Sequence, residues 1–205
     1  MTIRAHKGDL PNLDNYRVKA VAIDTETLGL VPHRDRLCVV QLSPGDGTAD
    51  VVQIAKGQTS APNIEALLAD PAIEKIFHFG RFDIAVMEHA FGVRANPVFC
   101  TKIASRLTRT YTDRHGLKDV VGELLDVSIS KQQQSSDWAA EELTQAQLEY
   151  AASDVLYLHA LREKLNARLE REGRMKEAQA CFTFLPTRAK LDLMGWDEED
   201  IFAHS

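Results

Sequence analysis

The sequence of 205 residues has few cysteines, and their pattern excludes two kinds of structural framework. The three cysteines, Cys38, Cys100 and Cys181, are far apart, odd in number and free of any Cys-x-x-Cys spacing. Reduced thiols in a protein core fit this usage better than a disulfide framework or a zinc site.

Long apolar runs are also missing from the sequence. Nowhere do about 18 consecutive apolar residues follow one another, and the N-terminal segment lacks the apolar stretch of a secretory signal. We therefore expect a cytoplasmic protein with no membrane partner.

Positive charge is scarce, because 24 Lys and Arg stand against 30 Asp and Glu, for a formal net charge of −6. Proteins that bind long nucleic acids through counterion release usually present a basic face. A long polyanion is therefore a poor candidate partner. A short phosphorylated substrate held through metal ions remains compatible, since cations bound to acids reverse the local field.

The 44% hydrophobic content is enough for one buried core, and neither low-complexity tracts nor internal repeats are present. Short apolar runs predict five strands, at 18–24, 37–43, 49–54, 75–79 and 98–100. Helical periodicity predicts helices at 63–69, 82–91, 101–109 and 116–125 and a long one over 143–172. Residues 1–16 are polar with turn signals. This order predicts an α/β fold with a mixed five-stranded sheet and flanking helices.

Two carboxylates end the first predicted strand. Asp24 and Glu26 follow the apolar run Val21-Ala22-Ile23, where desolvating a charge is costly unless a cation or hydrogen bonds compensate. Side chains two positions apart on a strand point the same way, so both carboxylates can face one metal site. A helix N-cap or a turn acid is the alternative interpretation of this stretch alone.

Two more acids lie in separate segments. Asp83 stands at the start of a predicted helix, where it could simply stabilise the helix dipole. Asp154 lies on a later helix, one turn after Tyr150 and on the same face. Taken alone, Asp154 would be interpreted as a solvated surface residue.

Together, Asp24, Glu26, Asp83 and Asp154 supply four hard oxygen ligands, which suit Mg²⁺ or Mn²⁺. Two such ions at one site are a recurrent device for phosphodiester cleavage. Tyr150 is then positioned to hydrogen-bond and orient the attacking water. The sequence therefore predicts a two-metal site with five catalytic residues.

These residues resemble a known class of enzymes. Asp24-x-Glu26, Asp83 and Tyr150-x-x-x-Asp154 resemble the DEDDy 3′-5′ exonucleases, which have the ribonuclease H-like fold. Three further segments resemble their ribonuclease D branch: His115-Gly116-Leu117-Lys118, Lys131-x-x-Gln134-x-Ser136-Asp137-Trp138 and Leu148-Glu149-Tyr150-Ala151-Ala152-x-Asp154-Val155-x-Tyr157-Leu158. The resemblance covers about residues 18–170. We expect one exonuclease domain over 1–205, with this catalytic core and a helical C-terminal segment over 171–205.

A chain of this length, with Asp24 to Leu30 as printed and ending in Trp196 to Ser205, resembles the bacterial nano-RNase C family most closely. That resemblance implies hydrolysis of short RNA, down to diribonucleotides, to nucleoside 5′-monophosphates. It also implies closed homo-oligomers, described in that family as octameric rings.

The substrate-binding candidates also rest on this comparison. Leu30 corresponds to a leucine that wedges between two bases in related oligoribonucleases, although it could be an ordinary core or loop leucine. His78 and Arg81 flank Asp83 and could reach phosphate; a structural His and a surface Arg are the alternatives. The remaining candidates are Thr25 between the first two acids and, in the loop before the catalytic helix, Lys131, Gln134, Ser135 and Trp138. Trp138 could instead fix that loop to the core.

Other functions remain open at this point. The nearest alternatives are a ribonuclease D-like enzyme that trims tRNA or longer RNA and a DNA 3′-5′ exonuclease. A catalytically silent nucleic-acid-binding module would belong to another class. Such a module should have lost ligands, whereas all five predicted catalytic residues are present.

Overall fold

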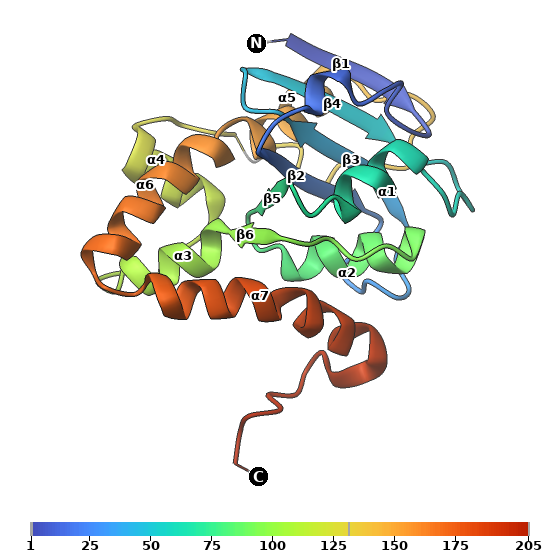
Figure 1. Cartoon of the computed structure of the whole chain (residues 1–205). Coiled ribbons are helices and arrows are strands. Elements are labelled where there is room, and N and C mark those ends of the chain that lie inside the picture. The colour runs from blue at the N-terminus through green and yellow to red at the C-terminus, as the bar shows by residue number, and fades with distance from the viewer. Residues whose placement is uncertain (1, 131, 205) are drawn as a thin grey trace.

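The computed structural model describes residues 2–130 and 132–204, which form an α/β fold around one mixed sheet (Figure 1). The sheet has six strands in the order β1-β4-β3-β2-β5-β6. The strands are β1 (Thr2–Lys7), β2 (Ala20–Thr27), β3 (Leu37–Ser43), β4 (Thr48–Gln53), β5 (Glu74–Phe77) and β6 (Val98–Cys100). The pair β2–β3 and the pair β3–β4 are antiparallel, and the other neighbours are parallel.

Seven α-helices surround the sheet in the described residues. They are α1 (Pro62–Ala69), α2 (Arg81–Phe91), α3 (Thr101–Thr108), α4 (Leu117–Leu125), α5 (Gln145–Leu156), α6 (Leu158–Arg171) and α7 (Met175–Leu191). A 3-10 turn spans Asp14–Tyr16, and a π-helical turn over Asp192–Trp196 follows α7.

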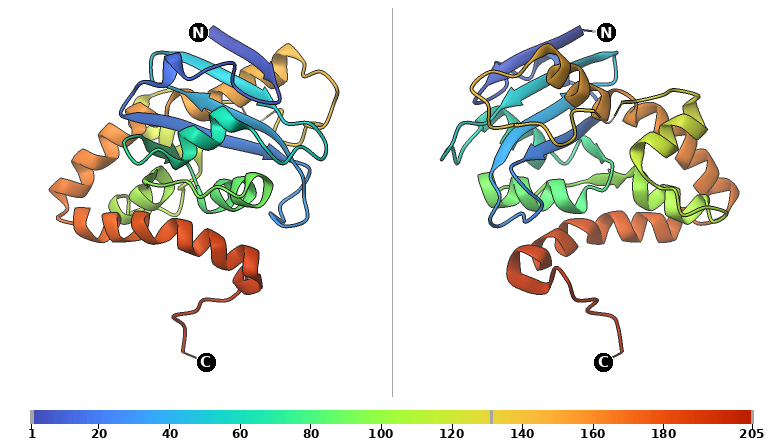
Figure 2. Two further views of the ribbon diagram at one scale, coloured as in Figure 1. Left: turned by 45° about the vertical axis from the view of Figure 1, so that its right-hand side comes forward. Right: turned by 180° about the vertical axis from the view of Figure 1, so that it is seen from behind.

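The helices cover both faces of the sheet. In Figures 1 and 2, α1 lies in front of one face and α5 covers the other. Helix α7 runs along the far side of α2 and α3, away from most of the sheet (Figure 1). This layering explains why every residue of β3 is buried, since a strand covered on both faces is shielded from solvent on each.

The predicted fold class is confirmed, but the sheet has one more strand than the five expected. The additional strand is β1, whose residues are exposed or half-buried and do not form an apolar run. It pairs in parallel with β4 at the edge of the sheet. An edge strand with charged side chains gives only a weak sequence signal.

Two smaller expectations also need correction. The long helix predicted over 143–172 is two helices, α5 and α6, which meet at Tyr157. Of the three thiols expected in the core, Cys38 and Cys100 are buried, whereas Cys181 is exposed on α7. Among the residues that the structure describes, no helix combines the length and apolar character needed to cross a membrane.

Candidate active site

The site forms at the carboxyl end of β2, near the centre of the sheet. Ala22 of β2 lies beside Ile76 of β5 in a parallel register, so Asp24 and the turn after β5 reach the same edge. Between Glu26 and Thr27 the pairing with β3 shifts register, and β2 ends there. Near this edge β2, the start of α2 and the C-terminal half of α5 lie close together.

Three of the predicted acids come together from β2 and α5. Asp24, Glu26 and Asp154 each offer a carboxylate oxygen, and these oxygens lie within 4.8 Å of one another. Oxygen ligands at that separation match what a hard divalent cation requires. The spacing of two along a strand and the position of Asp154 on α5 therefore bring these three carboxylates together.

Asp83 joins the cluster through a neighbour. Its carboxylate Oδ1 accepts a hydrogen bond of 2.6 Å from the Thr25 hydroxyl, and its own side chain is buried. Thr25, predicted to bind substrate, is itself buried and hydrogen-bonds the α2 acid. Thr25 lies between Asp24 and Glu26 in the chain, so this hydrogen bond holds the start of α2 next to the two acids of β2.

Burial and mutual repulsion disfavour the charged forms of the clustered acids. Burial, and then the charges of Asp83, Asp154 and Glu26, raise the pKa of Asp24 well above its ordinary value. Burial, with Asp154 and Asp83, raises the pKa of Glu26 to about 9. Burial also raises the pKa of Asp83 to about 7, against the opposing hydrogen bond from Thr25. Acids that repel one another in a desolvated site are best stabilised by a bound cation, so these residues fit a divalent metal.

Tyr150 lies on α5 one turn before Asp154 and is half-buried. Burial, followed by the charges of Asp154, Glu26 and Asp24, raises the pKa of its phenol, which therefore keeps its proton. The ring packs at 5.9 Å, centroid to centroid, against Trp138. Trp138 is only 2% exposed, and its indole Nε1 has no hydrogen-bond partner among the described residues. The buried indole of Trp138 therefore packs against the inner side of the Tyr150 ring and fixes its position.

His78 is held in the turn after β5. Its Nδ1 lies 2.9 Å from the Thr101 hydroxyl, which in turn donates to the Phe77 carbonyl. The Thr101 oxygen therefore accepts from His78, and Nε2 is the unprotonated nitrogen, buried with no partner in the described part of the chain. Burial, and then the charge of Lys102, lowers the pKa of His78 to about 3, so the imidazole is neutral.

Arg81 lies with the C-terminal segment rather than with the acids. Its guanidinium donates two hydrogen bonds of 2.6 and 2.8 Å to the Asp192 carboxylate, and one of 2.7 Å to the Asp197 carbonyl. Asp192 is almost fully buried and also pairs with Arg188 at 2.9 Å. Arg81 is the first residue of α2, which also carries Asp83. Its contacts therefore attach the start of this helix to the C-terminal segment.

The other predicted substrate residues lie on two loops. Leu30, in the loop between β2 and β3, is 85% exposed. Gln134 and Ser135 are exposed in the loop before α5, and Lys131 of that loop lies outside the described residues. Both loops flank β2 or α5, which carry three of the acids.

Phe79 was not among the predicted site residues. It has a φ of 67°, a left-handed conformation that is uncommon for an aromatic residue, and its side chain is 47% exposed. Lys102, to which the sequence assigned no role, places its ammonium 4.1 Å from the Phe79 ring centroid. The sequence feature that could have indicated a role for Phe79 is its position directly before Gly80, in the turn between β5 and α2.

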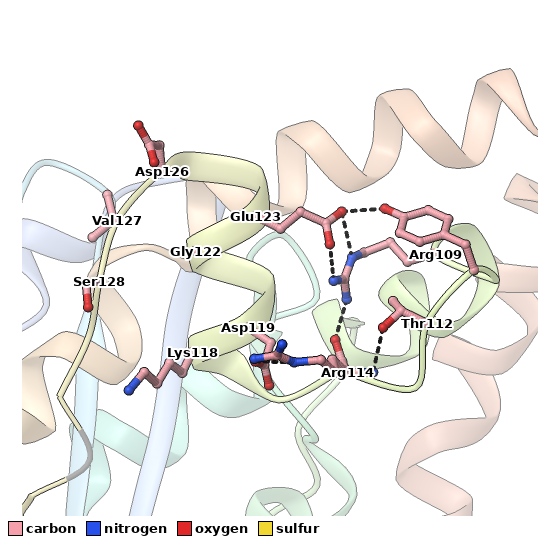
Figure 3. Close-up of a pocket in the computed structure, with 11 residues that line it drawn as sticks. Arg109, Thr112, Arg114, Lys118, Asp119, Gly122, Glu123, Asp126, Val127 and Ser128 are labelled. Atoms are coloured by element: carbon pink, nitrogen blue, oxygen red, sulfur yellow. Dashed lines mark hydrogen bonds and ion pairs between the residues drawn. The ribbon is translucent and has the colours of Figure 1, made fainter.

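A separate cleft of about 590 Å³ opens between α4 and the segment that links α3 to α4 (Figure 3). The motif His115 to Lys118 begins α4 beside it. Inside it Glu123 accepts hydrogen bonds from Arg109 and Tyr111, and Arg114 pairs with Asp119. Figure 3 shows Lys118 directed away from these ion pairs. The acids of the β2 cluster do not line this cleft, and its charges neutralise one another.

The strand order and the half-buried acid cluster together define a class, that of the nucleases with a ribonuclease H-like fold and carboxylate metal sites. The model of one family within it, described as 3′-5′ exonuclease, matches residues 11–170. The chain belongs to this 3′-5′ exonuclease family.

Known relatives differ in how much of their length the chain covers. It is 39% identical over 155 residues to Ribonuclease D of Granulibacter bethesdensis, which is 76% of this chain and 39% of that protein. The chain thus spans about two fifths of the curated ribonucleases that it matches. By contrast, Brucella melitensis NrnC with bound Mg²⁺ is 75% identical, with a TM-score of 0.97 and complete coverage of both chains. A second structure, Brucella melitensis NrnC bound to pGG, is 76% identical with a TM-score of 0.98.

Proposed function

We propose that this protein is a metal-dependent 3′-5′ exoribonuclease that hydrolyses short RNA, down to diribonucleotides, to nucleoside 5′-monophosphates. The observation that carries the proposal is the convergence of Asp24, Glu26 and Asp154 within 4.8 Å beside Asp83. The NrnC structures with Mg²⁺ and with pGG, which share about three quarters of their residues with this chain, support both the metal and the short substrate.

Asp24, Glu26, Asp83 and Asp154 are the proposed metal ligands. Two Mg²⁺ or Mn²⁺ ions held there would supply the charge that makes water a nucleophile at neutral pH and stabilises the leaving 3′ oxygen. Tyr150, with its proton retained on the phenol oxygen, would hydrogen-bond the attacking water and orient it toward the terminal phosphorus. Hydrolysis breaks the P–O3′ bond, and the products are a nucleoside 5′-monophosphate and an RNA shorter by one nucleotide.

The preference for short RNA has support in the chain itself. The net charge of −6 does not suit a long polyanion, and no basic groove is required to hold two nucleotides. Leu30, exposed four residues after Glu26, is our candidate for the side chain that separates two bases. The side chains of Thr25 and Arg81 are bonded to Asp83 and Asp192 within the protein. We propose that they position the site and do not contact the substrate directly.

We also propose the wider setting of the enzyme. Residues 1–205 form one exonuclease domain, because the apolar cluster that contains the β2 residues also contains Leu185 and Ala189 of α7. The protein acts in the cytoplasm as a homo-oligomer, and an octameric ring is the assembly that the family resemblance implies. The exposed Met194, Trp196 and Phe202 offer apolar surface for such contacts.

The test is hydrolysis of 5′-labelled RNA of two, three, seven and about twenty nucleotides, and of matched DNA, with Mg²⁺ or Mn²⁺. We expect the highest kcat/KM on the dimer and no activity in a chelator. Asp24→Ala and Asp154→Ala should each lower the rate by more than about 100-fold. Mutating a residue that only hydrogen-bonds a metal ligand already lowers activity by up to about 100-fold, and a ligand itself should matter more. Their melting temperatures should stay near that of the wild type.

Other results would point to other functions. Efficient digestion of the long RNA with slow turnover of the dimer would favour a ribonuclease D-like trimming enzyme, and faster digestion of DNA would favour a DNA exonuclease. Binding without hydrolysis under every metal condition would indicate a silent nucleic-acid-binding module. Full activity in Asp24→Ala or Asp154→Ala would refute the metal assignment.

A further inference from the structure

The loop between β2 and β3, residues 28–36, presents Leu30 to solvent directly after the metal-site strand. Leu30 is 85% exposed and Leu28 56%, although both are large apolar side chains. Side chains this exposed make few packing contacts, so their position depends on the backbone of the loop. The question is therefore what holds this loop open.

Main-chain hydrogen bonds close the loop at its base and at its tip. The Leu28 amide donates to the Arg36 carbonyl at 3.1 Å, and the amides of Arg34 and Asp35 donate to the Val31 carbonyl at 3.0 and 2.8 Å. The Thr27 hydroxyl donates to the Gly29 carbonyl. The segment around Leu30 is therefore a folded turn.

One carboxylate occupies the inside of this turn. Asp35 Oδ2 accepts a hydrogen bond of 2.9 Å from the Val31 amide, next to Leu30 in the chain. The Arg34 guanidinium donates to both oxygens of Asp35, at 2.8 and 2.9 Å. Only 13% of the Asp35 side chain is exposed, so its carboxylate is enclosed by the turn that it bonds.

Gly29 and Asp35 fit together closely. A Cβ added to Gly29 would lie 2.2 Å from Asp35 Oδ2 and 2.6 Å from its Cγ, far inside contact distance. The φ of Gly29 is not among the positive values, so its backbone conformation alone would accept another residue. A side chain at position 29 would therefore displace the Asp35 carboxylate from the turn.

We propose that Asp35 is a positioning residue, that Gly29 is the partner its carboxylate requires, and that together they hold Leu30 in place to separate the two bases of a dinucleotide. This rests on the proposed function. A preformed turn avoids the ordering cost that a mobile loop would incur on binding. Asp35 acts through Leu30 and does not touch the reacting phosphate.

The first test compares two substrates that differ in the number of bases. A diribonucleotide has two bases for Leu30 to separate, whereas the p-nitrophenyl ester of a nucleoside 5′-monophosphate has one base and the same kind of scissile phosphodiester. Asp35→Ala and Leu30→Ala should each raise KM for the diribonucleotide by about tenfold, which corresponds to about 1.4 kcal/mol. kcat on the diribonucleotide and kcat/KM on the ester should stay within about twofold of wild type.

The second test is a double-mutant cycle. Gly29→Ala alone should impair the diribonucleotide reaction as much as Asp35→Ala, because the new methyl displaces the carboxylate. In the Asp35→Ala background the same Gly29→Ala change should add nothing. Gly122→Ala is the matched control, since the nearest atom to its added Cβ is the Val127 carbonyl at 3.7 Å.

Two results would overturn the proposal. One is that the effects of Gly29→Ala and Asp35→Ala on the diribonucleotide reaction add up, and the other is that Asp35→Ala lowers kcat/KM equally for the diribonucleotide and the ester. Amide hydrogen exchange in residues 28–36 gives a measurement independent of activity. It should be faster in Asp35→Ala than in wild type, and unchanged exchange would also overturn it. If the wild-type protein leaves the diribonucleotide intact, the proposed function fails, and the exchange experiment still decides whether Asp35 holds the turn.

Discussion

At the scale of single residues, the metal-free site should make the protein less stable as the pH rises. The pKa of Glu26 is about 9 in the folded protein against an ordinary value of 4.5, so the folded state binds more protons between these values. The stabilising proton is fully present below about pH 4.5 and is lost as the pH rises through about 9. In a chelator, the melting temperature should therefore fall from about pH 6 to about pH 9.

Mg²⁺ should reverse this trend, because it replaces the proton as the partner of the carboxylates. Thermal unfolding followed by circular dichroism, with and without Mg²⁺, measures both effects. Glu26→Gln is the control and should show a flatter dependence on pH without metal. A melting temperature that rises with pH in the metal-free wild type would contradict the assigned pKa direction.

Tyr150→Phe should lower kcat by about 100-fold, the lower end of what a positioned proton donor or acceptor contributes. KM should change little, since the ring and its packing against Trp138 remain. Because the phenol pKa is raised, the wild-type pH–rate profile should show no loss of activity from Tyr150 ionisation below about pH 10. A variant with higher KM and unchanged kcat would assign Tyr150 to substrate binding instead.

The acids of the site could be predicted because their signals are local: a spacing of two on a strand and a spacing of four on a helix. The position of Arg81 could not, and for Trp138 the sequence left substrate binding and a role in fixing the loop both open. Arg81 contacts Asp192, which lies 111 residues further along the chain, and only the folded structure brings them together. The burial of Trp138 likewise depends on β3 and α5 packing over it.

At the scale of elements, β1 shows why a charged segment can form a strand. The Asp50 carboxylate of β4 accepts hydrogen bonds from Arg4 at 2.7 and 2.8 Å and from Tyr16 at 2.6 Å, and it lies 2.7 Å from His6 Nε2. Burial alone would raise the pKa of Asp50, but these partners lower it below its ordinary value. The polar residues that concealed β1 in the sequence are those that attach it to the sheet.

Asp50→Asn should therefore destabilise the protein by about 2–4 kcal/mol, because Arg4 and Tyr16 lose a buried charged acceptor. Urea unfolding measures the loss, and amide exchange should show the largest increase in residues 2–7. Asp46→Asn, at an exposed turn acid of the same hairpin, is the matched control and should cost less than about 1 kcal/mol. If amide exchange in residues 2–7 increased no more than in the other strands, or increased equally in the two variants, Asp50 would not be the residue that attaches β1.

Helix α5 illustrates the opposite case. Its start was predictable because Thr144 and Gln147 form a capping box, which is visible as Thr-x-x-Gln in the sequence. Its end at Tyr157 was not predictable, since no proline or glycine marks it and helical periodicity continues into α6. The break orients α5 along the sheet with Tyr150 and Asp154 facing β2.

At the scale of the whole molecule, four apolar side chains after α7 lie open to solvent: Met194, Trp196, Ile201 and Phe202. Phe202 is 77% exposed and touches only one ring, that of Phe184 at 5.8 Å, among the aromatic contacts in the described residues. Phe202→Asp should lower the mass of the proposed homo-oligomer measured by light scattering, because it places a charge where we propose an apolar contact between copies. Leu30→Ser, at an exposed apolar side chain near the active site, should leave that mass unchanged. Identical masses for all three proteins would argue against contacts through this segment.

The bond between Arg81 and Asp192 has a consequence for the interpretation of sequence variants. Position 192 lies beyond the region matched by the exonuclease family model, so comparison within that region would treat a change there as remote from catalysis. Asp192 nevertheless fixes the first residue of α2, two positions before Asp83. A substitution at this position, or a tag that pulls on residues 197–204, can therefore impair the enzyme while every residue of the acid cluster is intact.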